Sequence, residues 1–293
     1  MNNDRLLYRR GILQLVASGV FLSTAGIALR LVEQADGWQI LFYRSFALSI
    51  TILLILVFQK RSRFFDEFRG LGWNDCLLAV FLGTGFVAYV FALLYNTVAN
   101  ALFIFSCAPF LAGFLGWILL GERVATRTWL AIGVAMSGLA VMVGSELAVS
   151  RYLGTLLALW IPIAYAASII AVRRSKRDNM LVALCLAGLV AGGLSAFFVT
   201  DYALTPRDLI ISLYLGVFQV GVGFTLVVLG SRYVPAAQVG LLALVEPVLA
   251  PIWAWMGVGE VPGLATIVGG TIIFLAIGTD GILNIKSSEN HSA

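Results

Sequence analysis

The sequence carries one stretch twice, first as Pro109-Phe-Leu-Ala-Gly-Phe-Leu-Gly-Trp-Ile-Leu-Leu-Gly-Glu122 and again as Pro247-Val-Leu-Ala-Pro-Ile-Trp-Ala-Trp-Met-Gly-Val-Gly-Glu260. Both copies fit P-x-L-A-x4-W-x3-G-E without a gap, at a constant offset of 138 residues. A match of this length at a fixed offset indicates a duplicated unit. Weaker correspondences at slightly different offsets pair Asp75 with Asp208, so the duplication extends beyond the quoted stretch.

Composition places the chain in a membrane. Hydrophobic residues make up 60% of it and charged residues 12%, against about 25% charged in soluble proteins. No polar stretch in the 293 residues is long enough to form a soluble domain. The apolar runs predict an all-α membrane protein with ten transmembrane helices of about 20 residues each, near residues 12–32, 38–58, 75–95, 99–119, 128–145, 153–172, 181–199, 209–230, 236–257 and 263–283.

The distribution of Lys and Arg predicts the orientation. With the N-terminus in the cytoplasm, fifteen of the 19 Lys and Arg residues fall on that side, and only Arg30, Arg151 and Arg207 fall on the other. This bias places both termini in the cytoplasm of a multi-pass protein of the cell inner membrane. Glu122 and Glu260 then end their spans on opposite faces, where we expect a role in folding or gating.

The number of spans decides how the two copies are oriented in the membrane. Each unit has five spans, and because five is odd, the second unit enters the membrane upside down. We therefore expect one five-helix repeat over residues 1–148, a second and inverted repeat over 149–285, and a disordered tail at 286–293. Inverted repeats are typical of alternating-access transporters, with the substrate near the midplane between the halves. Duplication for the stability of the bundle alone is the simpler alternative.

The ten spans, the two five-span halves and the paired Gly-Glu motif resemble the EamA-type transporters of the drug/metabolite transporter superfamily, in their ten-helix form. The segment Leu244-Val-Glu-Pro-Val-Leu-Ala250 is similar to the pattern of that family's ninth helix. The resemblance covers nearly the whole chain. It implies a carrier similar to the bacterial exporters of amino acids and other metabolites, although relatives also move nucleotide sugars, vitamins and cationic drugs.

Two charged residues lie inside predicted spans. Arg44 is about seven residues into the second span, roughly 10 Å below the outer boundary at 1.5 Å per residue. Glu246 is near the centre of the ninth span. A charge at this depth costs about 2.5–3.5 kcal/mol, so a retained one normally faces a partner or a wet cavity. Arg44 can alternatively snorkel outward or make a structural pair, and Glu246 can make an interhelical hydrogen bond or pair with Arg44.

Other candidate positions surround these two charges. Pro109, Pro247 and Pro251 each remove a backbone hydrogen bond and can bend their helices, so they are candidate hinges, although prolines are also tolerated in membrane helices. One face of the ninth span leads from Glu246 to Trp253 and suits a ligand with an ammonium group and an apolar body. Further candidates for substrate contact, each of which can instead serve packing, are Tyr89, Asn100 and Trp160.

The motifs that mark enzymes are missing from the sequence. The single histidine, His291, lies in the tail, and the sequence contains no Walker loop, no G-x-S-x-G and no H-E-x-x-H. We therefore expect no enzyme, cofactor, metal site or nucleic-acid partner. The sequence predicts a secondary-active carrier that exports or exchanges small organic metabolites, with amino acids favoured as substrates and protons as a possible coupling partner. A passive channel or a membrane scaffold is the alternative.

Overall fold

A computed structural model describes residues 2–60, 64–95, 101, 104–143, 152–175, 180–259 and 261–290. These residues form helices and connecting turns, without a strand among them. The helices are α1 (Asn2–Leu22), α2 (Ala25–Arg30), α3 (Gly37–Lys60), α4 (Phe64–Arg69), α5 (Trp73–Tyr95), α7 (Ala108–Leu120), α8 (Thr126–Val143), α9 (Tyr152–Arg174), α10 (Leu181–Ala196), α11 (Pro206–Tyr214), the π-helical segment η2 (Leu215–Val222), α12 (Gly223–Gly230), α13 (Ala236–Ala243), α14 (Val245–Val258) and α15 (Leu264–Asn290).

The all-helical, membrane-type prediction is confirmed. Within the described residues, seven helical stretches are long and apolar enough to cross a membrane. Three shorter apolar helices, 108–120, 126–141 and 181–196, fall where the other three spans are predicted. These apolar stretches have 13, 16 and 16 residues, and α8, which contains the second of them, has 18 in all. A span needs about 17–25 residues, so the total of ten spans stays a prediction.

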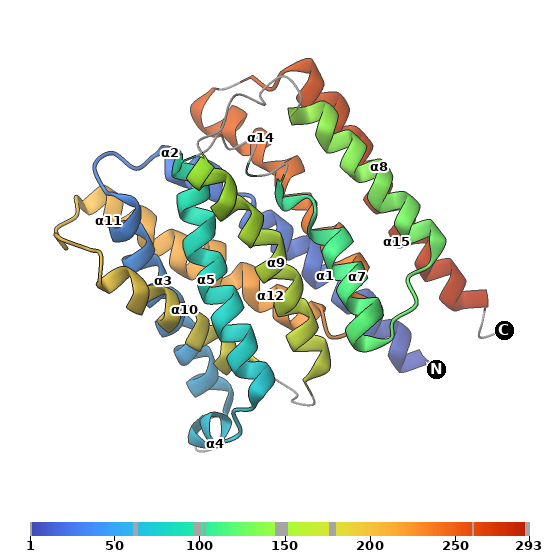
Figure 1. The fold of residues 1–293 in the computed structure, drawn as a ribbon, viewed down its shortest axis with the longest axis horizontal. Helices are drawn as coiled ribbons and strands as arrows, with labels where there is room; N and C mark the ends of the chain where they lie inside the picture. Colours follow the sequence, from blue (N-terminus) through green and yellow to red (C-terminus); the bar gives the residue numbers. More distant parts are fainter. Residues whose placement is uncertain are drawn as a thin grey trace.

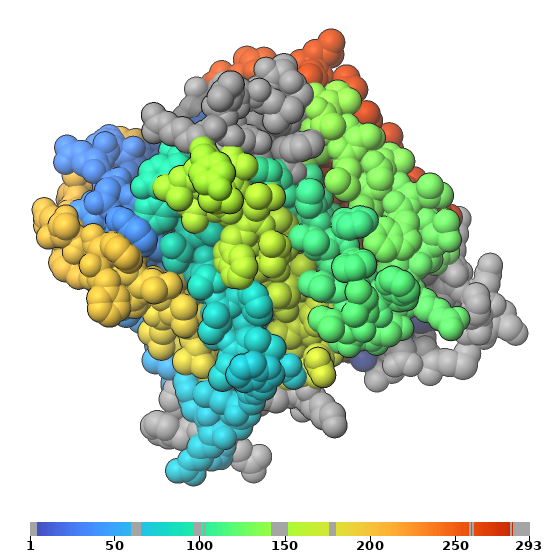
Figure 2. Space-filling model, in the orientation of Figure 1, coloured from blue at the N-terminus to red at the C-terminus, as the bar shows by residue number. Residues whose placement is uncertain are grey.

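Large apolar side chains cover much of the outside of the bundle. Phe58, Leu130, Phe197 and Phe274 are each more than 60% exposed. In water such a surface would drive aggregation, whereas in a bilayer it meets lipid, and each helix satisfies its own backbone hydrogen bonds. Figure 2 shows one face of the bundle, formed by α5, α7, α8, α9 and α10.

The helices pack in a pattern that stays the same when the two halves are exchanged. Helix α5 of the first half packs on α9 and α10 of the second half. In the corresponding way, α12 and η2 of the second half pack on α1 and α3 of the first half. Likewise α7 contacts α9, and α13 and α14 contact α1. The remaining pairs join equivalent helices: α3 with α10, α7 with α13, and α8 with α15. In Figure 1, α8 and α15 lie together along one edge of the bundle.

Several spans are interrupted near the middle of the bundle. The helix of the fourth predicted span stops in a turn at Ser106 and Cys107, just ahead of Pro109, and that of the ninth stops at Leu244, ahead of Pro247. A proline cannot donate to the carbonyl four residues earlier, which weakens the helix at that point. In the first span, Ser23 and Thr24 bond back to the carbonyls of the preceding turn, a pattern that bends helices. The interruptions in the duplicated spans therefore occupy matching positions.

The last helix overlaps the first residues of the predicted tail at 286–293. We expect disorder from residue 286, but α15 continues to Asn290. Residues 282–290 contain no glycine or proline that would end a helix, so the last turn of α15 extends beyond its apolar part. Residues 291–293 and the predicted boundary at 148–149 lie outside the described residues.

Candidate functional site

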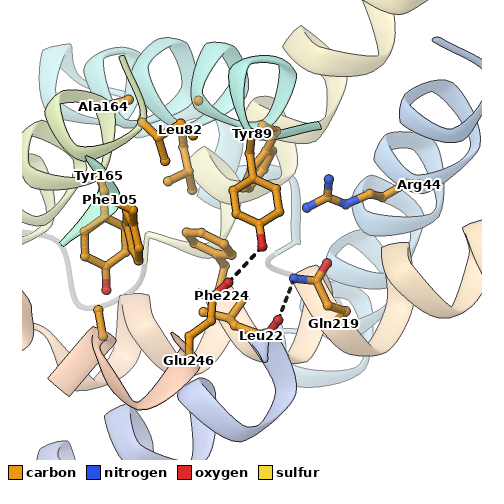
Figure 3. A pocket seen from close by; sticks show the side chains of 14 residues that line it. Leu22, Arg44, Leu82, Tyr89, Phe105, Ala164, Tyr165, Gln219, Phe224 and Glu246 are labelled. Atoms are coloured by element: carbon orange, nitrogen blue, oxygen red, sulfur yellow. Dashed lines mark hydrogen bonds between the residues drawn. The ribbon is translucent and has the colours of Figure 1, made fainter. Parts of the chain in front are cut away.

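A cavity of about 50 Å³ lies between the two halves of the chain. It is lined by α1, α3, α5, α9, η2, α12, α13 and α14, and by Phe105 from the interrupted fourth span (Figure 3). This volume holds roughly three or four water molecules. Pockets for drug-sized ligands measure about 300–1,000 Å³, so the cavity has to widen before a metabolite can enter.

Arg44 reaches this cavity from α3 and is only 5% exposed. Its guanidinium carbon lies 5.6 Å from the ring centre of Phe86 and 5.9 Å from that of Tyr89, distances typical of cation–π contacts. Because the side chain is buried at the cavity, it does not extend to the outer interface, which contradicts the snorkelling alternative. No hydrogen bond or ion pair joins the guanidinium to another described residue, so its donors are available to an anionic ligand.

Glu246 faces the same cavity from the first turn of α14 and is 6% exposed. Its Oε1 accepts a hydrogen bond of 2.9 Å from the hydroxyl of Tyr89 on α5. The predicted interhelical hydrogen bond is therefore present, but it occupies one carboxylate oxygen only. The ion pair with Arg44 is not formed among the described residues, although Arg44 and Glu246 interact electrostatically across the cavity. The partial positive charge at the start of α14 also favours a carboxylate here.

Gln219 adds a neutral polar group to the cavity wall. It belongs to η2 and is 2% exposed. Its Nε2 donates to the carbonyl of Leu22 at 3.4 Å, and its Oε1 is buried without a hydrogen-bond partner. A buried acceptor without a donor costs about 1–3 kcal/mol. Gln219 and Arg44 line the same cavity (Figure 3), so a ligand held by Arg44 can also donate to the free Oε1.

The rest of the wall is largely aromatic. Phe105 contacts Tyr165 edge-on at 5.5 Å between ring centres, Tyr165 contacts Phe224 at 6.4 Å, and Phe224 contacts Phe86 at 5.0 Å. Edge-to-face contacts of this kind fix the rings relative to one another. The site thus combines one guanidinium, one carboxylate and one free amide oxygen with an apolar wall.

The structure brings together only part of the predicted site. Arg44, Tyr89 and Glu246 line one cavity. Trp253 does not line it, and its indole Nε1 donates to Ser23 Oγ at 2.7 Å, at the interruption between α1 and α2. Trp160 is turned away as well, with Nε1 donating to Thr84 Oγ1 at 3.0 Å. Asn100 lies outside the described residues.

The candidate hinges sit at or near helix interruptions. Pro109 is in the first turn of α7, Pro247 is in the first turn of α14, and Pro251 lies inside α14. The residues four positions before the first two prolines, Phe105 and Ala243, both line the cavity. The paired prolines therefore weaken the helices at the cavity wall. Whether the helices bend there during transport stays a prediction.

Sequence reasoning missed a buried carboxylate in the last span. Asp280 is 3% exposed and accepts from Thr128 Oγ1 at 2.9 Å and from Gln238 Nε2 at 3.2 Å. Gln238 in turn accepts from the hydroxyl of Tyr8 at 2.9 Å. These contacts tie α15 to α1, α8 and α13, away from the cavity. The signal in the sequence is an aspartate inside the predicted span 263–283.

A charged pair joins the two halves at one end of the bundle. Glu122 lies two residues after the end of α7. Its Oε1 accepts from Nε and Nη2 of Arg173 at 2.5 Å each, and its Oε2 accepts from the backbone N–H of Ala236 at 2.9 Å. Arg173, near the end of α9, also donates to the carbonyls of Ser231 and Val234. We call this arrangement the inner clasp. The corresponding Glu260 lies outside the described residues.

Among the described residues, no group of three or more His, Cys, Asp or Glu side chains gathers closely enough to hold a metal ion.

Comparisons with known proteins agree with this architecture. An uncharacterized transporter of Archaeoglobus fulgidus is 28% identical over 271 residues, which cover 92% of this chain and 95% of the relative. The uncharacterized transporter YwfM of Bacillus subtilis is 26% identical over 176 residues, covering 58% of this chain and 60% of the relative. A solved structure described as "Crystal structure of protein" shares the fold, with a TM-score of 0.76 over 97% of this chain and 98% of the other, at 18% identity. The profile of the EamA-like transporter family matches twice, over residues 9–144 and 152–279, and the chain therefore belongs to this family of membrane transporters.

Proposed function

We propose that this transporter is a secondary-active carrier that exports or exchanges small organic metabolites, with amino acids or related amphipathic compounds as its substrates. The observation that carries the proposal is the buried cavity in which Arg44 and Glu246 face the same space without pairing. A zwitterionic molecule brings one charge for each of them.

In this proposal, each polar group of the cavity wall binds one part of the substrate. The carboxylate of the substrate binds the guanidinium of Arg44, whose planar donors suit a carboxylate. The ammonium group binds the free oxygen of Glu246 and the unpaired Oε1 of Gln219. The apolar part of the substrate packs on the rings of Tyr165 and Phe224. Because a charge left unpaired in a buried site is costly, both ends of the substrate contribute to selectivity.

Neither charged residue has a charged counterpart in the other repeat. At the offset of 138 residues, Glu246 corresponds to Ala108. Arg44 lies in α3, whose counterpart α10 contains no charged residue. The duplication therefore does not by itself explain the two charges, which supports a role in recognition. Glu246 can also accept a proton in place of an ammonium group, which makes protons a candidate coupling partner.

Alternating access between two inverted repeats completes the proposal. The contacts between helices, which stay the same when the halves are exchanged, and the two family matches support halves related by a pseudo-two-fold axis in the membrane plane.

The orientation in the inner membrane is part of the proposal. The bias of Lys and Arg supports both termini in the cytoplasm. Reporters fused at both ends and at loops 59–73 and 173–180 test this orientation. A periplasmic reporter at 173–180 contradicts it.

Counterflow in proteoliposomes tests the function. The purified chain is reconstituted and preloaded with each of a panel of unlabelled metabolites, and uptake of the labelled compound is followed. A carrier gives saturable uptake that is stimulated by substrate on the opposite side. A passive channel gives flux that does not saturate and no counterflow, and a scaffold gives neither. The variant Glu33→Gln, which alters an exposed residue, serves as a folded control.

A further inference from the structure

A second, smaller chamber continues the central cavity toward the inner clasp. Its wall comes from α5, α9 and α12 with the residue that follows α12. The lining residues are Leu78, Leu82, Tyr165, Ser168, Ile169, Val172, Phe224, Val227, Val228 and Ser231. Of the described residues that line it, none carries a charge, and the side chains with a polar atom are Tyr165, Ser168 and Ser231. The chamber has a volume of about 10 Å³, so it is nearly closed.

Three side chains belong to both the cavity and the chamber. Leu82, Tyr165 and Phe224 line each of them, so these side chains form the partition between the two spaces. Two of the three are held by other rings: Phe224 contacts Phe86 at 5.0 Å and Tyr165 at 6.4 Å, and Tyr165 also contacts Phe105 at 5.5 Å. A molecule passing from the cavity to the chamber has to displace these rings.

The inner clasp closes the far end of the chamber. Val172 and Ser231 line the chamber, and Arg173 follows Val172 directly. Arg173 donates to the carbonyl of Ser231 at 2.9 Å and is held by Glu122. Glu122 and Arg173 are each 18% exposed at their side chains, so the pair lies at the boundary between the interior and the surface.

We propose that the chamber is the cytoplasmic half of the transport path, and that it receives the apolar body of the substrate after release from Arg44 and Glu246. Leu82, Tyr165 and Phe224 form the first barrier, and the inner clasp forms the second. This proposal rests on the proposed carrier function. Because the wall offers no charge between Glu246 and Arg173, an unbalanced charge crosses it poorly and a zwitterion or a neutral molecule crosses it more easily.

Cysteine labelling tests the path without a known substrate. Cys76, Cys107 and Cys185 are replaced by alanine, and Ser168→Cys or Ser231→Cys is introduced, each a small change in the chamber wall. Inside-out membrane vesicles then receive a membrane-impermeant methanethiosulfonate in its cationic form and, separately, in its anionic form, because Glu122→Gln leaves the charge of Arg173 at the entrance. We expect Ser168→Cys to react at least tenfold faster when Glu122→Gln weakens the inner clasp.

The control is Val80→Cys on α5, because Val80 is 51% exposed on the outside of the bundle. We expect no reaction there, with the clasp intact or weakened. The proposal is overturned when both chamber cysteines stay unreactive in both backgrounds, or when weakening the clasp leaves their reaction rates unchanged. Counterflow on the same proteins separates the two proposals. If the native chain shows counterflow but the chamber cysteines are not labelled, only the proposed path is overturned. If the cysteines are labelled but the native chain shows no counterflow, only the carrier function is overturned.

Discussion

The hydroxyl of Tyr89 donates a 2.9 Å hydrogen bond to Oε1 of Glu246, and these two residues come from opposite halves of the chain. The ring of Tyr89 also lies against the guanidinium of Arg44, at 5.9 Å from ring centre to Cζ. One side chain thus contacts both charged groups of the cavity (Figure 3). Tyr89 therefore positions Glu246 and holds Arg44 at once, and the two roles can be separated by substitution.

Tyr89→Phe removes the hydroxyl and keeps the ring. We expect normal insertion and a rise in KM for counterflow of about five- to tenfold, because Glu246 loses the donor that orients it but keeps its own contact with the substrate. Tyr89→Ala also removes the cation–π contact and should impair transport further. Tyr43→Phe is the matched control, since its hydroxyl bonds to the backbone of Tyr202 away from the cavity. Equal effects of Tyr43→Phe and Tyr89→Phe would contradict this role.

Glu246→Gln keeps the shape and most of the hydrogen bonding of the side chain but cannot titrate. We expect normal insertion, retained or weakened substrate binding, and loss of pH-dependent transport, because a proton or an ammonium group can no longer neutralise the site. The measurement is counterflow across a range of pH, compared with the exposed variant Glu33→Gln. Transport at the native level with unchanged pH dependence would leave Glu246 as a structural partner of Tyr89 only.

Arg44→Lys and Arg44→Gln test recognition of a carboxylate. Lysine keeps the positive charge but lacks the planar fork, and glutamine loses the charge. Since a hydrogen bond to a charged group contributes about 1.5–3 kcal/mol, Arg44→Gln should weaken binding of a carboxylate substrate by roughly 10- to 150-fold. The amide analogue of the same substrate is the internal control and should lose much less. Equal losses for acid and amide would show that Arg44 supports the cavity rather than binding the substrate.

The sequence predicts the apolar helices and singles out Arg44 and Glu246 as charges inside them, because both features depend on local chemistry. An apolar run long enough to span a bilayer is readable without tertiary contacts. Arg44 and Glu246 stand out because charges inside such runs are rare. Asp280 obeys the same rule, but it lies near the end of the predicted span 263–283, where a charge is easily assigned to the interface.

The aromatic wall could not be predicted in the same way. Phe86, Phe105 and Phe224 are three of 19 phenylalanines, and only the packing of neighbouring helices separates cavity rings from lipid-facing ones. The helical spacing of the sequence alone predicts that Trp253 lies on the same face as Glu246. The two residues share a helix, but the indole N–H of Trp253 donates a hydrogen bond to Ser23 instead of facing the cavity. Gln219 lies in η2, where the π-helical turn changes the register that a 3.6-residue period assumes.

Asp280→Asn tests whether the buried network of α15 is structural. Thr128 and Gln238 both donate to the carboxylate, and the amide of asparagine would place a donor against one of them. We expect the free energy of unfolding in detergent to fall by about 1–3 kcal/mol, the cost of an unsatisfied buried group. KM and the ranking of substrates should stay unchanged, because Asp280 does not line the cavity. Thr279→Val, at the exposed neighbouring position, should change stability by less than about 0.5 kcal/mol. A changed substrate ranking in Asp280→Asn, at native stability, would instead assign this carboxylate to transport.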